Sequence, residues 1–299
     1  MILKVTYFGN IYKNMSRDIP SYILPNREEM RISRLENKNV VKYFNVHRHK
    51  YYEIIIITSC TEGSFSHSID FVSYPLEAGY IYFIAPGQTH EWDVKIYNGE
   101  YKGFLITFNK SFLLSGNISL TQTLSKLFNP LNKMPYIQYK QDKLLEAFSV
   151  LQILEDEYKK SSSNFYALRS LLESLLHYVV KLKSELPSST DIDSLRLNSL
   201  HYEIEKHFKE ERNVEFYARK LNLSAKRLNE IVKSMTGETV TQTLHHRLHL
   251  EAKREIVSGI KNIQTISDDL GFENPSYFSR FFKKNEGMTP TEFSTQLFK

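Results

Sequence analysis

The C-terminal third of the chain contains one pattern of residues twice, and the two copies are about 50 residues apart. Each copy has a small residue where two helices would cross, apolar residues to fill the crossing, and a glycine at the end. The pattern predicts two helix-turn-helix units, at 214–236 and 263–286, and a tandem pair constrains the fold far more than one unit would. The matched pairs are Ala218 with Ser267, Leu221 with Leu270, Leu228 with Phe278, Val232 with Phe282, Lys233 with Lys283, and Gly237 with Gly287.

The residues around these units agree with the prediction. Ser224 and Asn274 stand where the second helix of each unit begins, and both side chains can accept a hydrogen bond from a first-turn N–H. Pro275 suits an early helical position, which needs no donor N–H. A connecting helix of about 18 residues, about 27 Å long, would hold the units near one DNA turn apart. Its apolar stripe consists of Leu244, Leu248, Ala252 and Ile256.

The second helix of each unit carries polar and basic side chains that favour contact with DNA. Arginine and asparagine can pair with base edges, whereas lysine and serine mostly bind phosphates. The alternative is a pair of ordinary solvated helix faces. The residues expected to contact DNA are Ser224, Lys226, Arg227, Asn229, Glu230, Lys233, Asn274, Ser276, Tyr277, Arg280, Lys283 and Lys284.

The segment 194–299 resembles the DNA-binding domain of AraC/XylS-type transcriptional regulators. The motifs that carry the resemblance are Arg247-Leu248-x-x-x-Ala252, Ile266-Ser267-x-x-Leu270-Gly271-Phe272, and Tyr277-Phe278-Ser279-Arg280-x-Phe282-Lys283-Lys284-x-x-Gly287-x-Thr289-Pro290. The resemblance implies that the residues at Lys226, Glu230, Ser276 and Arg280 face the bases, and that the protein recruits RNA polymerase. Glu230 departs from the usual basic chemistry, because a carboxylate can only accept a hydrogen bond, for instance from cytosine N4.

The first 115 residues have a different texture, rich in aromatic and β-branched residues between turn signals. Short strand-like runs such as Tyr51–Thr58, Gly79–Ile84 and Gly103–Phe108 predict a small β-barrel or jelly roll. Residues 142–184 then change to helical spacing and predict a helical hairpin with a break at Ser161–Ser163. The hairpin either covers the barrel or forms a dimer interface, because its second helix is unusually rich in apolar residues.

A group of polar residues in the predicted barrel resembles the ligand set of the cupin fold: His47-x-His49-x-x-x-Glu53, followed by Gly79, Pro86-Gly87 and His90. An isoleucine run replaces the glycine that cupins have soon after the glutamate. The resemblance to AraC/XylS-type proteins implies an effector-sensing barrel without metal, so we expect neither a metal nor a cofactor. The residues expected to bind a small-molecule effector are His47, His49, Glu53, Tyr82, His90 and Trp92, with Tyr52 and Tyr80 nearby.

Composition narrows the remaining classes. The formal net charge is +5, from 39 basic and 34 acidic residues, so net charge alone does not identify a nucleic-acid partner. A single cysteine, Cys60, excludes an internal disulfide framework. The start of the sequence lacks the features of a signal peptide, and Ile54–Ile57 is too short to cross a bilayer, so a cytoplasmic protein without membrane contact is expected.

These observations predict an α+β protein of two domains. Residues 1–184 form a cupin-like, effector-sensing and dimerising domain, 185–193 a polar linker, and 194–299 an all-α domain with two helix-turn-helix units joined by a long helix. The expected function is a homodimeric, ligand-responsive transcription activator that binds promoter DNA. The alternatives are a metal-dependent cupin enzyme fused to a DNA-binding domain and an activator without effector. We expect no enzymatic activity, because no P-loop, Rossmann fingerprint, nucleophile elbow or His-Glu-x-x-His motif occurs.

Overall fold

The computed structural model describes residues 21–24, 29–36, 46–62, 65–94, 99–113, 118–131, 134–139, 145–185 and 192–297. Contacts divide this chain into two compact units, Ser21–Tyr202 and a second that begins at Glu203, and each is described by itself. The expectation that the first residues form no signal peptide concerns residues 1–20, which lie outside the described residues. Residues 142–144 of the predicted hairpin and 186–191 of the predicted linker lie outside them too.

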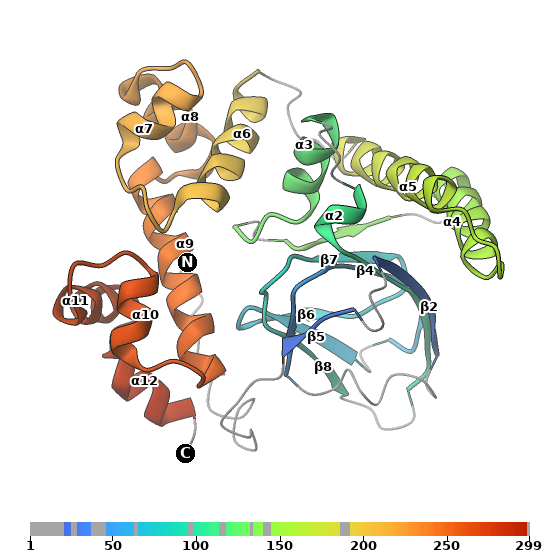
Figure 1. The fold of residues 1–299 in the computed structure, drawn as a ribbon, viewed down its shortest axis with the longest axis horizontal. Coiled ribbons are helices and arrows are strands. Elements are labelled where there is room, and N and C mark those ends of the chain that lie inside the picture. The colour runs from blue at the N-terminus through green and yellow to red at the C-terminus, as the bar shows by residue number, and fades with distance from the viewer. Residues whose placement is uncertain are drawn as a thin grey trace. The chain divides into compact units, whose positions relative to one another are not determined.

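The first unit is built on two facing antiparallel sheets, which together we call the barrel (Figure 1). The larger sheet has the order β10-β7-β4-β9-β2, and the smaller has the order β6-β5-β8. A short parallel pair, β1 with β3, lies beside them. The strands are β1 Ser21–Tyr22, β2 Met30–Glu36, β3 Arg48–His49, β4 Tyr52–Cys60, β5 Phe65–Ile69, β6 Val72–Pro75, β7 Tyr80–Ile84, β8 His90–Val94, β9 Tyr101–Phe108 and β10 Tyr136–Gln138.

The isoleucine run in β4 is explained by burial on both faces of the larger sheet. Successive side chains of a strand point to opposite faces, so a strand covered on both sides has no polar alternation. Ile55 and Ile57 belong to the core between the two sheets. Ile54 and Ile56 belong to a second core on the outer face of the same sheet. The run that replaces the expected cupin glycine therefore anchors both cores.

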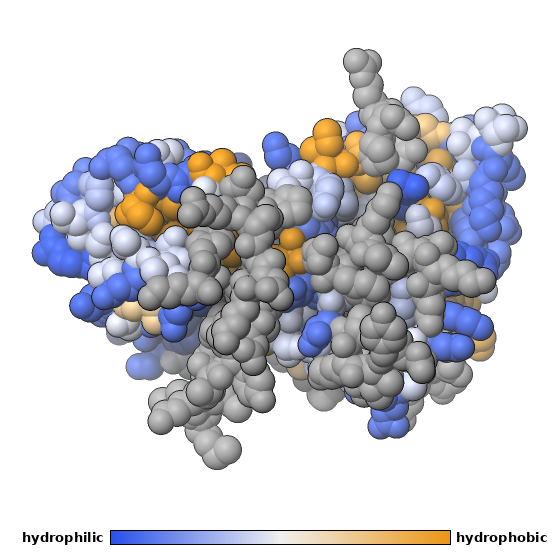
Figure 2. All heavy atoms as spheres, turned by 90° about the horizontal axis from the view of Figure 1, so that it is seen from below, coloured by the Kyte–Doolittle hydropathy of each residue, from blue (hydrophilic) through white to orange (hydrophobic). Residues whose placement is uncertain are grey.

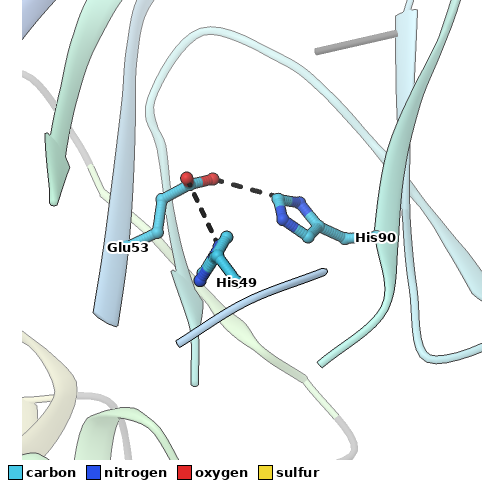
Figure 3. Close-up of side chains that lie close together, drawn as sticks. All are labelled: His49, Glu53 and His90. Atoms are coloured by element: carbon cyan, nitrogen blue, oxygen red, sulfur yellow. Dashed lines mark ion pairs between the residues drawn. The ribbon is translucent and has the colours of Figure 1, made fainter. Parts of the chain in front are cut away.

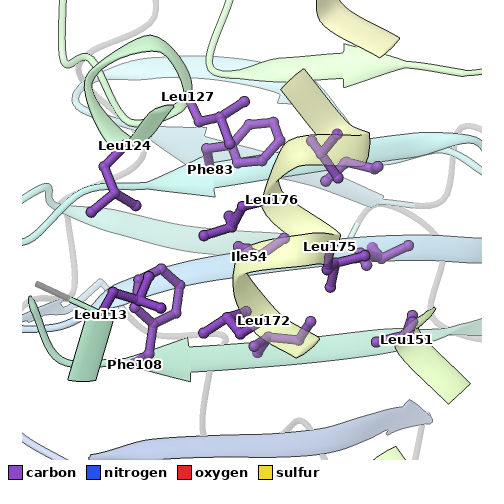
Figure 4. Packing of buried hydrophobic residues seen from close by; sticks show 14 of the residues in the cluster. Ile54, Phe83, Phe108, Leu113, Leu124, Leu127, Leu151, Leu172, Leu175 and Leu176 are labelled. Carbon is purple, nitrogen blue, oxygen red and sulfur yellow. The ribbon is translucent and has the colours of Figure 1, made fainter. Parts of the chain in front are cut away.

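Helices cover that outer face (Figure 4). They are α2 Lys110–Leu113, α3 Ile118–Leu127, α4 Leu145–Tyr158 and α5 Phe165–Glu185. Leu172, Leu175 and Leu176 of α5 are buried in the core on this face of the sheet. α4 packs against α5, and the two helices form the predicted hairpin. The predicted linker is wrong at its edges: Glu185 is the last residue of α5, and α6 already begins at Ile192. Polar residues can stand at helix ends, so the polar composition that suggested a linker did not prevent helix formation at its two edges.

The second unit is helical, as predicted. α6 Ile192–His207 begins before the contact boundary and is followed by α7 Val214–Lys220, α8 Ala225–Thr236, α9 Val240–Ser258, α10 Ile263–Asp269, α11 Pro275–Glu286 and α12 Pro290–Leu297. α7 with α8, and α10 with α11, are the two predicted helix-turn-helix units. α9 is the predicted connecting helix, and its 19 residues start with a capping box of Thr239 and Gln242. Its apolar stripe, Leu244 to Ile256, is buried.

On the face shown in Figure 2, the visible described residues are mainly hydrophilic, and hydrophobic residues gather in small separate patches. Within the described residues, no helix combines the length and the apolar character that crossing a membrane requires.

Candidate functional site

The two helices expected to contact DNA begin and end in the same way. Ser224 caps α8 by accepting a hydrogen bond from Arg227 N, and Asn274 caps α11 by accepting one from Tyr277 N. Gly237 and Gly287 end these helices with φ angles of 78° and 87°, in the left-handed region that favours glycine. The repeat seen in the sequence is therefore also a repeat of capping geometry.

The small residues of the repeat lie where predicted. Ala218 and Ser267 are buried at the crossings of α7 with α8 and of α10 with α11, and Leu228 and Phe278 are buried in the second helices. Ile231, Val232 and Phe282 are buried as well, so α8 and α11 each have one inward face and one face that points to solvent. Nine of the residues expected to contact DNA are exposed on α8 or α11 and lack a capping role: Lys226, Arg227, Glu230, Lys233, Ser276, Tyr277, Arg280, Lys283 and Lys284.

Three of the expected contact residues have a role inside the fold. Asn229 donates to Ala225 O at 3.1 Å and accepts from Val240 N at 3.0 Å, so its amide joins α8 to the start of α9. Ser224 and Asn274 are helix caps. Two of the exposed residues contact a neighbour on their own helix. Glu230 lies 3.7 Å from Arg227 in an ion pair, and Ser276 carries the carbonyl that receives Arg280 Nε at 3.4 Å.

Arg212 connects the two helix-turn-helix units. Its guanidinium donates to Leu270 O at 2.7 Å and to Gly271 O at 2.9 Å, and lies 4.1 Å from the centroid of the Phe272 ring. Gly271 has φ +70°, and a Cβ there would lie 2.3 Å from Lys209 O. The segment before the first unit is thus packed directly on the turn of the second. Sequence reasoning missed Arg212, because its partners are backbone carbonyls 58 and 59 residues away.

A buried ionic network holds α9 in place. Arg247 Nε lies 2.6 Å from Glu205 of α6, and its Nη1 lies 3.0 Å from Glu251. Arg254 also contacts Glu251, at 3.2 Å. Burial raises the pKa of Glu251, but Arg247 and Arg254 outweigh burial and hold it at about 2. Arg247, which contributed to the family resemblance, therefore has a structural role in this unit.

Inside the barrel, polar side chains from three strands meet (Figure 3). His49 of β3 and His90 of β8 both face Glu53 of β4. The distance from His49 Nε2 to Glu53 Oε2 is 3.5 Å, and that from His90 Nδ1 to Glu53 Oε1 is 3.9 Å. All three side chains are buried. The chain thus brings together residues that its sequence separates by up to 41 positions (90 minus 49).

Burial dominates the electrostatics of this cluster. It raises the pKa of Glu53 to about 8 and lowers the pKa of His49 to about 3, with His47 contributing to the latter. It also lowers the pKa of His90 well below its usual value. These directions follow from the cost of a charge in a low-dielectric interior. Burial therefore favours the uncharged forms of this carboxyl and of these imidazoles.

His67 was missed in the sequence, because a single histidine in β5 carries no motif. Its Nε2 lies 3.0 Å from His90 Nδ1, and burial lowers the pKa of His67 to about 3. Its only sequence signal is a polar residue at an inward position of a strand. The backbones of His47 and His90 pair in an isolated antiparallel β-bridge, and the centroids of their rings are 4.1 Å apart.

The expected aromatic residues divide between the two cores. Tyr82 and Trp92 lie in the core between the sheets, together with Tyr80, and the Tyr82 hydroxyl donates to Pro75 O of the other sheet. Tyr52 is wrong as a lining residue: it stacks on Phe108 in the outer core. The reason is strand alternation, since Tyr52 and Glu53 are neighbours in β4 and point to opposite faces.

The three histidines of α9 have separate partners. His246 contacts Glu238 at 3.2 Å, His249 contacts Glu286 at 3.2 Å, and the centroids of the His245 and Phe281 rings lie 5.5 Å apart. Among the described residues, the one group of histidine, cysteine or carboxylate side chains close enough to share a metal ion is His49, Glu53 and His90.

Comparison with known proteins gives matches over both units. The model of an AraC-like ligand-binding domain matches residues 31–180, and that of a helix-turn-helix domain matches residues 217–296. The chain belongs to the AraC family. This regulator therefore combines a ligand-binding barrel with a DNA-binding helical unit, and the comparisons give no support to the enzyme alternative.

Curated relatives of this AraC-family chain are transcriptional regulators. The HTH-type transcriptional activator RhaR of Mannheimia succiniciproducens is 21% identical over 265 residues, which cover 89% of this chain and 92% of the relative. RhaR of Yersinia pestis is 22% identical over 278 residues, covering 89% of each chain. Among solved structures, ToxT from Vibrio cholerae O395 is 15% identical, covering 90% of this chain and 97% of that chain, with a TM-score of 0.42.

Proposed function

We propose that this regulator activates transcription by inserting α8 and α11 into adjacent major grooves of promoter DNA. The observation that carries the proposal is the repeated geometry: two helices with matched caps present basic side chains from matched positions, such as Lys233 and Lys283. Arginine in the groove selects bases, while lysine neutralises phosphates. Arg280 of α11 is the main base-contacting residue in this proposal. The RhaR relatives are activators, which favours recruitment of RNA polymerase.

The second part of the proposal is effector control through the barrel. The effector contacts the buried polar cluster of His49, Glu53 and His90. His47, Tyr82 and Trp92 lie beside this cluster. The effector binds one arrangement of the molecule more tightly than the others and thereby favours that arrangement. The coupling free energy between effector and DNA would then appear as a change in the affinity for DNA. The protein then acts where promoter DNA is, in the cytoplasm.

The third part is a homodimer formed through the hairpin of α4 and α5. Most of the apolar residues that first indicated an interface are used within the chain, because Leu168, Leu172 and Leu175 pack in the outer core. The support now comes from large apolar side chains that the hairpin leaves exposed. These are Leu145 at 70%, Ile153 at 55%, Phe165 at 46% and Tyr166 at 76% exposure.

The experiment that tests the function is selection of genomic DNA fragments by the purified full chain at about physiological salt, where non-specific binding is weak. The expected result is an enriched motif with two blocks one helical turn apart, repeated for a dimer. Failure to enrich any motif, with and without added cell extract as a source of effector, would contradict the proposal. Sedimentation of Ile153→Glu beside wild type tests the dimer, and an unchanged mass would exclude this interface.

A further inference from the structure

α8 and α11 each carry a pair of exposed side chains at the same two positions, the third and the sixth residue of the helix. In α8 these residues are Arg227 and Glu230, and in α11 they are Tyr277 and Arg280. Residues three positions apart lie on one face of a helix, so the two members of each pair can make contact. Because the two helices are capped alike, the sixth residue lies one and a half turns from the start of both.

In α11 the tyrosine ring orients the arginine. The guanidinium carbon Cζ of Arg280 lies 4.5 Å from the centroid of the Tyr277 ring, and Arg280 Nε donates to Ser276 O at 3.4 Å. A cation is attracted to the electron-rich face of an aromatic ring. No carboxylate in the described part of the chain forms an ion pair with Arg280. Both Nη groups of Arg280 are therefore available as donors to a base.

These contacts also set the direction of the arginine. Tyr277 and Ser276 precede Arg280, so both contacts draw its guanidinium toward the N-terminal end of α11. That end of a recognition helix is the one that contacts base edges in the major groove. Guanine presents O6 and N7 there as adjacent acceptors, which match two N–H donors of one guanidinium. A side chain that is already oriented loses less conformational entropy when it binds.

In α8 the same two positions carry an ion pair instead. Arg227 Nη1 lies 3.7 Å from Glu230 Oε2, and the two side chains are 48% and 51% exposed. Arg227 thus draws the carboxylate toward the N-terminal end of α8. A carboxylate can only accept, and cytosine N4 is a donor in the major groove. Adenine N6 is a donor too, but the neighbouring adenine N7 is an acceptor and would repel a carboxylate.

We propose that Tyr277 and Arg227 are positioning residues, which orient Arg280 and Glu230 so that α11 selects guanine and α8 selects cytosine. The proposal rests on the proposed function above, because both helices must enter the major groove. It implies that the two blocks of the DNA motif differ in sequence although the two units share one fold. The lysines at matched positions of the two helices contact phosphates in both units and add no selection.

The first test uses the full chain and DNA duplexes that carry the motif from genomic selection, with single base pairs replaced. The guanine in question is the position at which Arg280→Ala loses its preference. Tyr277→Ala should lower the preference for this guanine about 2–5-fold, the effect of an exposed cation–π contact. The salt slope should not change, because no charge is removed. Tyr277→Phe keeps an aromatic ring and should behave as wild type.

The matched control on the same helix is Asn285→Ala. Asn285 is exposed, and its position five residues after Arg280 places it nearly on the opposite side of α11. We expect wild-type affinity and base preference from this variant. Circular dichroism of each variant verifies folding. Should Tyr277→Ala not fold, Tyr277→Leu gives the same test, since leucine keeps apolar bulk without an aromatic face.

The second test concerns α8. Glu230→Gln should change the preference at one position from cytosine to adenine, because a glutamine amide matches adenine N6 and N7. Arg227→Ala should weaken the preference for cytosine about 2–5-fold, the effect of an exposed ion pair. In Glu230→Ala, the further change Arg227→Ala should leave base preference as it is, because the side chain that Arg227 orients is gone. Base preference is a ratio of affinities, so loss of a phosphate contact does not change it.

The outcomes separate the two proposals. Full guanine preference in folded Tyr277→Ala, or equal losses in Tyr277→Ala and Tyr277→Phe, would overturn the positioning role of Tyr277. A cytosine preference that persists in Glu230→Gln or in Arg227→Ala would overturn the selection by α8. In these cases specific binding by the wild type leaves the proposed function intact. Failure of the wild type to bind any motif specifically would overturn the proposed function and the base selection together.

Discussion

The guanidinium of Arg212 donates a hydrogen bond of 2.7 Å to the carbonyl oxygen of Leu270. This bond joins the segment that precedes the first helix-turn-helix unit to the turn of the second. It also supplies a donor to a carbonyl at the C-terminal end of α10, where helices leave such groups without an internal partner. The relative placement of α8 and α11 therefore depends on Arg212 as well as on α9.

Replacement of Arg212 tests this coupling. Arg212→Ala should lower the free energy of unfolding by about 1.5–3 kcal/mol, since it removes charge-assisted hydrogen bonds and a ring contact. It should also weaken binding to DNA with both motif blocks more than binding to DNA with one. Arg212→Lys keeps the charge but loses the forked geometry, so we expect an intermediate effect. Urea unfolding and fluorescence anisotropy measure the two quantities, and equal loss on both DNAs would contradict the coupling.

Two glycines with similar φ angles should respond differently to alanine. Gly237→Ala should cost about 1–2 kcal/mol, because φ is +78° and a Cβ would meet nothing within 4 Å. Gly271→Ala should cost distinctly more, since its Cβ would also lie 2.3 Å from Lys209 O. Thermal unfolding of the two variants side by side gives the comparison. Equal losses would show that the 209–212 segment moves away freely.

Arg280 and Lys233 should affect DNA binding in different ways. Arg280→Ala should cost about 1–3 kcal/mol on the preferred sequence and relax selectivity, because a base contact is lost. Lys233→Ala should weaken binding evenly across sequences and reduce the salt slope by about one, as expected for a phosphate contact. Anisotropy titrations at several salt concentrations separate these effects. An unchanged affinity and preference in Arg280→Ala would mean that α11 does not contact bases.

The attachment of the hairpin to the barrel should depend on pH through Glu155. Its carboxylate accepts two hydrogen bonds of 2.7 Å from Arg34 of β2, which hold its pKa at about 2 against an ordinary 4.5. A lowered carboxyl pKa means that the stabilisation is complete above pH 4.5 and is lost as pH falls toward 2.

We therefore expect Glu155→Gln to lower the free energy of unfolding by about 1–2 kcal/mol at pH 7, a modest value because Arg34 is half-exposed. The difference from wild type should close as pH approaches 2. Asp156→Asn, at an exposed neighbouring position, is the control and should behave as wild type. A difference that stays constant between pH 7 and pH 3 would show that the ion pair contributes nothing.

Local patterns determined the helical unit almost completely. The repeat, its caps at Ser224 and Asn274, and the stripe of α9 all depend on residues close together in the sequence, and helices form from such local contacts. Domain order and the helical hairpin followed from changes in periodicity for the same reason. The residues proposed to face DNA could be named because the inward positions of α8 and α11 leave the others outside.

Tertiary structure alone decided the contacts between distant residues. Neither the link from Arg212 to Leu270 nor the pairing of His67 with His90 has a local signal, because each partner is chosen by the packing of separate elements. Which of Tyr52 and Glu53 faces the interior of the barrel depends on strand register, which pairing across the sheet sets. The sequence indicated a barrel with a cluster of polar residues and a DNA-binding unit, and only the folded chain brought His67 to that cluster, because the pairing of β5 with β8 places it beside His90.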